Sequence, residues 1–184
     1  MALKQTMAPA IEPVTLADAK AFLRVDTDAE DAFITSLITT ARLQVETALD
    51  LALIEQEWTL AGVGPGTVAP LRLHPLAEVL SVMAIDDAGN ASPVSADTVA
   101  TNLDARPATV SVCPSPTHAQ TLTIAFRAGF GATAEDVPAP IRHALLMLIA
   151  HWFENREPVS FGQSASRIPD AVSDLLKPYR AVRL

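Results

Sequence analysis

Residues 121–152, TLTIAFRAGFGATAEDVPAPIRHALLMLIAHW, decide the fold class because the hydrophobic period changes part-way along the stretch. In its first part Leu122, Ile124 and Phe126 alternate with smaller or polar residues, the pattern of a strand buried on one face. From Pro140 onward the apolar residues follow the period of an amphipathic helix, with a proline in its first turn. A strand followed by such a helix predicts a fold that mixes both kinds of element.

Two further helices are expected near the N-terminus. Thr15 and Asp18 form a variant of the capping box, which predicts a short helix that ends at about Arg24. Asp28 is expected to cap a second helix over roughly residues 29–50. Its apolar residues form one broad stripe, which predicts a buried face, and they are Phe33, Ile34, Leu37, Ile38, Ala41, Val45, Ala48 and Leu49.

Between these helical parts the chain has the pattern of short strands separated by turn residues. The expected strands cover residues 56–61, 79–85, 99–103, 109–112 and 121–127, with a short extended piece at 71–73. The fold class is therefore α+β. We expect a helical core of two N-terminal helices and a long C-terminal helix, a β-strand insert, and an extended C-terminal arm.

This pattern divides the chain into four parts. Residues 1–13 are expected to be a loose leader, and residues 14–54 and 132–158 the helical core. The β insert covers residues 55–131, and residues 159–184 form a linker and an arm. The linker, about residues 160–167, contains glycine and serine, which predicts flexibility.

The last residues carry the clearest sign of a partner. Lys177 and Pro178 end a short amphipathic turn, and proline cannot continue a helix, so we expect an extended arm. Tyrosine and arginine are enriched at protein interfaces. The residues expected to contact another chain are Leu175, Leu176, Pro178, Tyr179, Arg180, Val182, Arg183 and Leu184. The alternative is that the arm packs on its own domain.

Composition excludes several classes of function. The chain has 184 residues, with 13 basic and 21 acidic residues and a net charge of −8, which argues against a protein that grips DNA phosphates. Cys113 is the single cysteine, so an intrachain disulfide framework is excluded. Residues 1–12 lack the pattern of a signal peptide, and the apolar run at 144–150 is too short to span a bilayer, so we expect no membrane partner.

Neither a catalytic nor a metal-binding motif is evident, and no cofactor is expected. The glycines of residues 62–66 lack the lysine and hydroxyl residues of a phosphate loop and are interpreted as a turn. Asp86 and Asp87 precede Ala-Gly-Asn and are interpreted as turn residues rather than an acid–base pair. A small enzyme and a soluble ligand-binding module remain as alternatives, and the residues that would test the first include His74 and His118.

Four motifs resemble the head–tail connector (adaptor) proteins of tailed phages, a family that includes the adaptors of gene transfer agents. Residues 137–146, VPAPIRHALL, and 150–157, AHWFENRE, resemble its main helix, with Phe153 where tyrosine is more usual. Residues 13–26, PVTLADAKAFLRVD, resemble its opening. Residues 71–79, LRLHPLAEV, and 175–180, LLKPYR, resemble the entry to the β insert and the closing motif.

The resemblance implies a structural subunit without catalysis. Such proteins form a ring, usually a dodecamer, below the portal protein; the ring extends the DNA channel and carries the stopper and tail. DNA would pass through the lumen without specific binding. The subunit would be made in the bacterial cytoplasm and end in the neck of a phage or gene transfer agent particle.

The resemblance also assigns roles to individual residues. The arm would dock on the portal, with Tyr179 as anchor and Arg180 and Arg183 paired with portal acids. The β insert is a weaker candidate for the surface that faces the stopper. Residues expected to form the core or the ring contacts of the last helix are Ile141, Arg142, Leu145, Trp152, Glu154 and Arg156.

Overall fold

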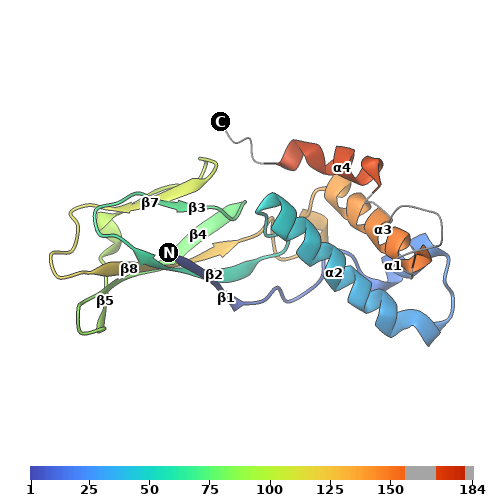
Figure 1. The fold of residues 1–184 in the computed structure, drawn as a ribbon, viewed down its shortest axis with the longest axis horizontal. Helices are drawn as coiled ribbons and strands as arrows, with labels where there is room; N and C mark the ends of the chain where they lie inside the picture. The colour runs from blue at the N-terminus through green and yellow to red at the C-terminus, as the bar shows by residue number, and fades with distance from the viewer. Residues whose placement is uncertain (156–168, 181–184) are drawn as a thin grey trace, which may run out of the picture. The chain divides into compact units, whose positions relative to one another are not determined.

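The computed structural model describes residues 1–155 and 169–180, and the chain divides into two compact units (Figure 1). The first, here called the β unit, comprises Met1–Ala10 and Ile54–Ala132. The second, the helical unit, comprises Ile11–Leu53 and the chain from Thr133 onward. The described residues form four α-helices and antiparallel sheets, so the α+β prediction is confirmed.

A five-stranded antiparallel sheet is the larger part of the β unit. Its order is β1-β2-β8-β4-β5, with the bounds β1 Ala2–Met7, β2 Gln56–Val63, β8 Thr121–Ala128, β4 Leu76–Ile85 and β5 Ala91–Pro93. A second sheet has the order β3-β7-β6, with β3 Ala69–Leu71, β7 Ala108–Val112 and β6 Val99–Asn102. A short 3-10 helix, η2 (Ala96–Thr98), precedes β6.

The central strand β8 behaves as its alternation predicts. Leu122, Ile124 and Phe126 are buried, whereas the residues between them are half-exposed. Ile124 lies opposite Leu60 of β2 and Val82 of β4, and both of these are also buried. One face of the sheet therefore forms the core of this unit, and we call it the inner face.

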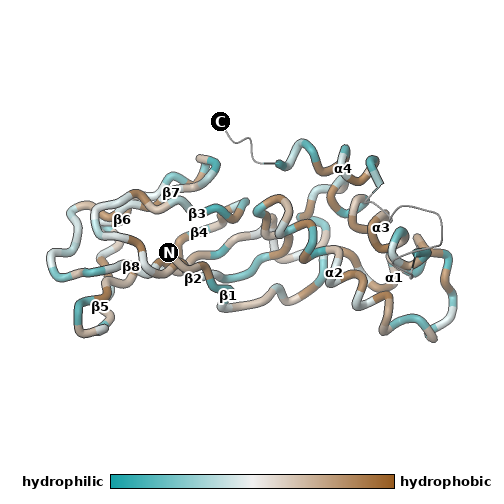
Figure 2. Tube along the Cα trace, viewed as in Figure 1, coloured by the Kyte–Doolittle hydropathy of each residue, from teal (hydrophilic) through white to brown (hydrophobic). Residues whose placement is uncertain are grey.

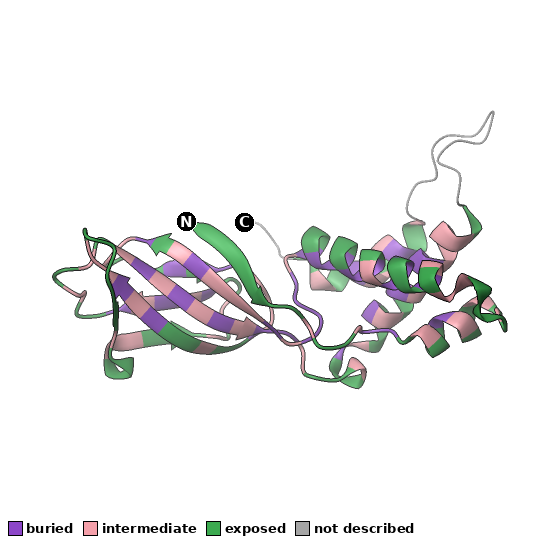
Figure 3. Cartoon of the chain, turned by 90° about the horizontal axis from the view of Figure 1, so that it is seen from below, coloured by how far each residue is buried: buried purple, intermediate pink, exposed green. Residues whose placement is uncertain are grey.

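The prediction of a loose leader over residues 1–13 is wrong. Ala2–Met7 forms β1, which pairs with β2 in antiparallel register. All six of its residues are exposed, as Figure 3 shows, so backbone pairing rather than burial holds this edge strand. Because no residue of β1 is buried, its sequence lacks the alternation of apolar and polar residues that predicts a strand.

The helical unit contains α1 (Leu16–Leu23), α2 (Asp31–Leu49), α3 (Ala139–Glu154) and α4 (Asp170–Leu176). Helix α2 packs on α1 and α3, and α4 packs on α3. Figure 2 shows hydrophobic and hydrophilic residues alternating along α2 and α3, as expected for helices with one buried face. In the part of the chain that the structure describes, no helix combines the length and the apolarity that a membrane span requires.

Helix α1 begins as predicted, whereas α2 does not. The Thr15 hydroxyl accepts a hydrogen bond from the Asp18 backbone N–H (3.0 Å) and donates one to the Asp18 carboxylate (2.6 Å). Asp28, the expected cap of the second helix, instead begins a 3-10 turn, η1 (Asp28–Glu30). Its carboxylate binds Lys20 at 2.8 Å, and Lys20 also binds Asp31 at 2.7 Å. These hydrogen bonds raise the pKa of Lys20 and tie α1 to the start of α2.

Candidate interaction surfaces

A buried ion network fixes the N-terminal segment of the helical unit on α2. The Arg42 guanidinium binds Glu12 through Nε (2.8 Å) and Glu46 through a terminal nitrogen (2.9 Å). Glu46 also accepts the Leu53 backbone N–H at 2.9 Å, and Glu12 accepts the Thr39 hydroxyl at 3.0 Å. Burial acts to lower the pKa of Arg42, but the two carboxylates outweigh it and raise that pKa. Arg42 therefore holds Glu12 directly, and Glu46 connects the same network to Leu53 beyond the end of α2.

The charged residues in the body of α2 are buried in this network, so the solvent-facing side of the helix carries no charged side chain. Arg42 and Glu46 are the charged residues between Asp31 and the end of the helix, and both are buried. The exposed positions are Ala32, Thr35, Ser36, Thr40, Leu43, Gln44, Thr47 and Ala48. An uncharged, partly apolar helix face on a chain of net charge −8 is suited to contact with another protein rather than with water alone.

The residues predicted on the last helix separate into core and surface. Ile141 and Leu145 are almost fully buried in α3, so they stabilise the unit and do not reach a partner. Trp152 is half-buried, Glu154 is exposed, and Arg156 lies outside the described residues. Of the residues expected in the core or the ring contacts, Ile141 and Leu145 therefore belong to the core.

Arg142 lies at a pocket between α1 and α3. The pocket has a volume of about 370 Å³ and is also lined by Val14, Asp18, Phe22 and His143. The His143 ring meets the Phe22 ring edge-on, with centroids 5.9 Å apart. The Arg142 Nε atom is buried and has no hydrogen-bond partner among the described residues. A cation in the lining of a partly apolar pocket is a second candidate contact point.

The expected extended arm is helical in its first part. Asp170–Leu176 forms α4, and Lys177–Tyr179 forms a 3-10 turn, η4, in which Pro178 occupies an early position that needs no N–H. Val172 and Leu176 are buried, so the prediction that Leu176 faces a partner is wrong. These two residues are four apart, on one side of the helix, and they anchor α4 in the helical unit.

Part of the C-terminal segment stays available to a partner. Pro178 and Arg180 are exposed, and Leu175 and Tyr179 are half-buried. Val182, Arg183, Leu184 and the linker at 160–167 lie outside the described residues. The structure thus presents Pro178 and Arg180 directly after an anchored helix.

Asp86, one of the residues considered for an enzyme, is held by its own turn. Both oxygens of the Asp86 carboxylate accept hydrogen bonds from its own turn, from Ala88 and Asn90 at 2.8 to 3.0 Å, and these bonds lower its pKa. The turn interpretation is therefore confirmed. His118 lines the same pocket as Asp86, about 260 Å³ in volume. The pKa of His74 is lowered by burial and then by the nearby Arg106. In the described parts of the chain, no three His, Cys, Asp or Glu side chains are grouped to hold a metal ion.

The face of the large sheet opposite the inner face carries a second ion group. Arg127 of β8 binds Glu57 of β2 at 3.0 Å and Glu78 of β4 at 2.5 Å. Two carboxylates share one guanidinium, so this outer face carries excess negative charge next to the exposed edge of β4. The Glu78 side chain is half-exposed and can accept a further cation.

Sequence reasoning missed the Arg42 network although a signal exists. Arg42 and Glu46 lie directly after Ala41 and Val45, inside the apolar stripe, at a spacing of four residues. Charged side chains in a buried stripe are expected only when they are paired. Glu12, 30 residues from Arg42 in the chain, has no comparable local signal.

Comparison with known families and structures identifies the chain. The model of the family described as "Head completion protein" matches residues 12–182. The chain belongs to the head completion protein family. This membership confirms the resemblance to phage and gene transfer agent head–tail connectors.

This head completion protein is also similar over its whole length to chains of solved particles. One, from the neck of an empty gene transfer agent (GTA) particle with C6 symmetry, is 27% identical, with a TM-score of 0.85. A second, from the virion of a native GTA particle, is 26% identical with a TM-score of 0.81, and a third, from the neck of a native particle with C12 symmetry, is 26% identical with a TM-score of 0.72. Each similarity covers 100% of this chain and 97% of the other. No curated protein matches the chain.

Proposed function

We propose that this head completion protein is a structural head–tail adaptor in the neck of a gene transfer agent or a related phage particle. The observation that carries the proposal is the similarity to GTA neck chains over 100% of this chain and 97% of each of those chains. A shared fold alone does not specify function. Here the family match and the neck structures point to the same role, and the described residues offer surfaces rather than a catalytic group.

The adaptor is a ring subunit in this proposal. Twelve copies surround the DNA channel below the portal and join the head to the stopper and tail. The uncharged face of α2, from Ala32 to Ala48, supports this, because a ring buries two different sides of each subunit. A net charge of −8 suits a lumen from which DNA phosphates must move on without being held.

The direct test removes the protein from particle-producing cells. Without it we expect heads that lack tails, with normal assembly restored when the wild-type chain is supplied in trans. Electron microscopy of the restored particles, with a small fusion tag on this chain, should show added density between head and tail. Normally tailed particles in cells without the chain would exclude the proposed function.

The end of the chain is the proposed portal contact. Pro178, Tyr179 and Arg180 follow directly on the anchored α4, and Val182, Arg183 and Leu184 complete the contact in this proposal. Arg180 and Arg183 pair with portal acids, and the aromatic ring of Tyr179 supplies apolar area. The stopper is proposed to bind the β unit.

Truncation after Lys177 tests the portal contact separately from the fold. Val172 and Leu176, the buried anchors of α4, remain, so the melting temperature should change little. Attachment to purified portal should be lost, as measured by co-sedimentation. The control replaces residues 178–184 with an equally long Gly/Ser segment, which should behave like the truncation. Portal binding at wild-type level by either variant would show that the contact lies elsewhere.

A further inference from the structure

Two edges of the large sheet are open, and they lie at opposite ends of its strand order. At one end, β1 pairs with β2 and has no strand on its other side among the described residues. At the other end, β5 pairs only with Met83–Ile85 of β4, and the Val82 carbonyl accepts the Val94 N–H. Residues 76–81 of β4 therefore also present an unpaired edge within the described structure. Open edges are templates for pairing with another chain.

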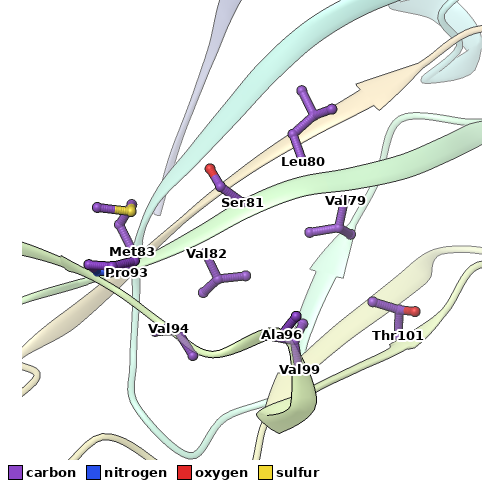
Figure 4. A pocket seen from close by; sticks show the side chains of 10 residues that line it. All are labelled: Val79, Leu80, Ser81, Val82, Met83, Pro93, Val94, Ala96, Val99 and Thr101. Atoms are coloured by element: carbon purple, nitrogen blue, oxygen red, sulfur yellow. The ribbon is translucent and has the colours of Figure 1, made fainter.

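An apolar pocket adjoins the open edge of β4. It has a volume of about 340 Å³ and is lined by Val79, Val82, Val94, Ala96 and Val99, among others. Figure 4 shows Val79 and Val82 on the side of β4 that faces Val94 to Val99, and Leu80 and Ser81 on the other side. Val79 and Val82 pair with Phe126 and Ile124 of β8, so this part of the pocket lies on the inner face, while Leu80, Ser81 and Met83 line it at the edge of the strand.

Strand β1 carries a side chain of the matching kind on the same face. Leu3 lies opposite Leu60, which lies opposite Ile124, so Leu3 belongs to the inner face. Its side chain is 45% exposed. Met7 lies opposite Glu57 and so belongs to the outer face, and it is 48% exposed. The strand therefore presents one unburied leucine toward the face on which the pocket opens.

The two edges also match in direction, length and charge. Three antiparallel pairings separate β1 from β4, so these two strands run in opposite directions within one subunit. If neighbouring copies are related by rotation about an axis parallel to the strands, β1 of one copy is also antiparallel to β4 of the next. Strand β1 has six residues with one bulge between Gln5 and Met7, and the open part of β4 has six residues with bulges at Ala77 and Leu80. On the outer face β1 carries Lys4, whereas β4 carries the half-exposed Glu78.

From these observations we infer that β1 of one subunit pairs antiparallel with residues 76–81 of β4 in the next, and that its Leu3 enters the pocket lined by Val79, Val82 and Val99. Lys4 then lies near the Glu78 carboxylate, which shares Arg127 with Glu57. The contact uses different surfaces of the two copies, so it repeats around a closed ring. It deepens the proposed function and rests on the proposed ring.

Cysteine crosslinking in complete particles tests the contact. Cys113 is exposed and is first replaced by serine. Leu3→Cys is then combined with Ala96→Cys, and particles are treated with a short bismaleimide. We expect a ladder of linked oligomers on denaturing gels from the double variant and only monomer from each single variant. The matched control, Met7→Cys with Ala96→Cys, should stay monomeric because Met7 is on the outer face.

A second test places a charged residue at position 3 or position 7 and measures how much of the chain enters particles. Leu3→Arg should reduce the amount of this chain in particles at least tenfold, whereas Met7→Arg should leave it unchanged. Both side chains are exposed in the single subunit, so neither change should alter its melting temperature. Particles that contain the chain but give no ladder, or equal ladders from the two cysteine pairs, would overturn the strand contact and leave the adaptor role standing. Particles that never contain the chain would contradict the adaptor role itself.

Discussion

Replacement of Gly129 by alanine is expected to lower the free energy of unfolding by on the order of 3 to 5 kcal/mol. Gly129 follows β8 and has a φ of +146°. A Cβ atom there would lie 2.5 Å from the Glu55 backbone nitrogen and 2.7 Å from the Ile54 carbonyl carbon. Backbone atoms cannot turn away as a side chain can, so two crossing segments would have to separate.

The measurement is chemical denaturation of the purified variant, with Gly89→Ala as the matched control. Gly89 also has a positive φ, +84°, but a Cβ atom there would meet nothing within 4 Å. The control therefore has the conformational cost without the overlap, about 1 kcal/mol. If the two variants lost equal stability, the close approach at Glu55 would not be the cause.

Removal of the Arg42 guanidinium is expected to cost about 3 to 5 kcal/mol, because Arg42→Met leaves Glu12 and Glu46 partly or fully buried without their cation. Methionine keeps much of the apolar stem, so the loss reports the charge rather than a cavity. The segment from Ile11 to Thr15 should also become more accessible to protease.

A double variant provides the control for this prediction. Arg42→Met combined with Glu46→Gln removes one of the stranded charges, so it should recover part of the lost stability in the same denaturation experiment. Gln44→Met, on the exposed face of α2, should have almost no effect. A double variant less stable than Arg42→Met alone would show that Glu46 contributes through Leu53 rather than through the arginine.

Most elements with a buried face could be predicted from the sequence, whereas two strands without one, β1 and β5, could not. The alternation of Leu122, Ile124 and Phe126 and the stripe of α2 both reflect burial, and both elements form where expected. Strand β1 has no buried residue, and β5 (Ala91–Pro93) has three exposed ones, so neither has a hydrophobic period to detect. Their existence depends on backbone pairing with distant strands.

For the candidate surfaces too, the local sequence shows residue types but not the contacts between distant parts of the chain. Tyr179 and Arg180 are candidates because their residue types are typical of interfaces. The burial of Leu176 depends on packing of α4 against α3, which the local sequence does not encode. The open edge of β4 depends on how far β5 extends along it, and the face of Leu3 depends on its register with Leu60. Pairing between strands distant in sequence determines both.

The division of the chain into two units has a consequence for biosynthesis. The chain passes between the units three times, after Ala10, Leu53 and Ala132. During translation β1 emerges first, yet the sheet lacks its central strand until Ala128 has left the ribosome. Helix α2 likewise waits for α3, which begins at Ala139. Because these contacts are distant in sequence, neither core can close early, and we expect folding to begin only when synthesis is nearly complete.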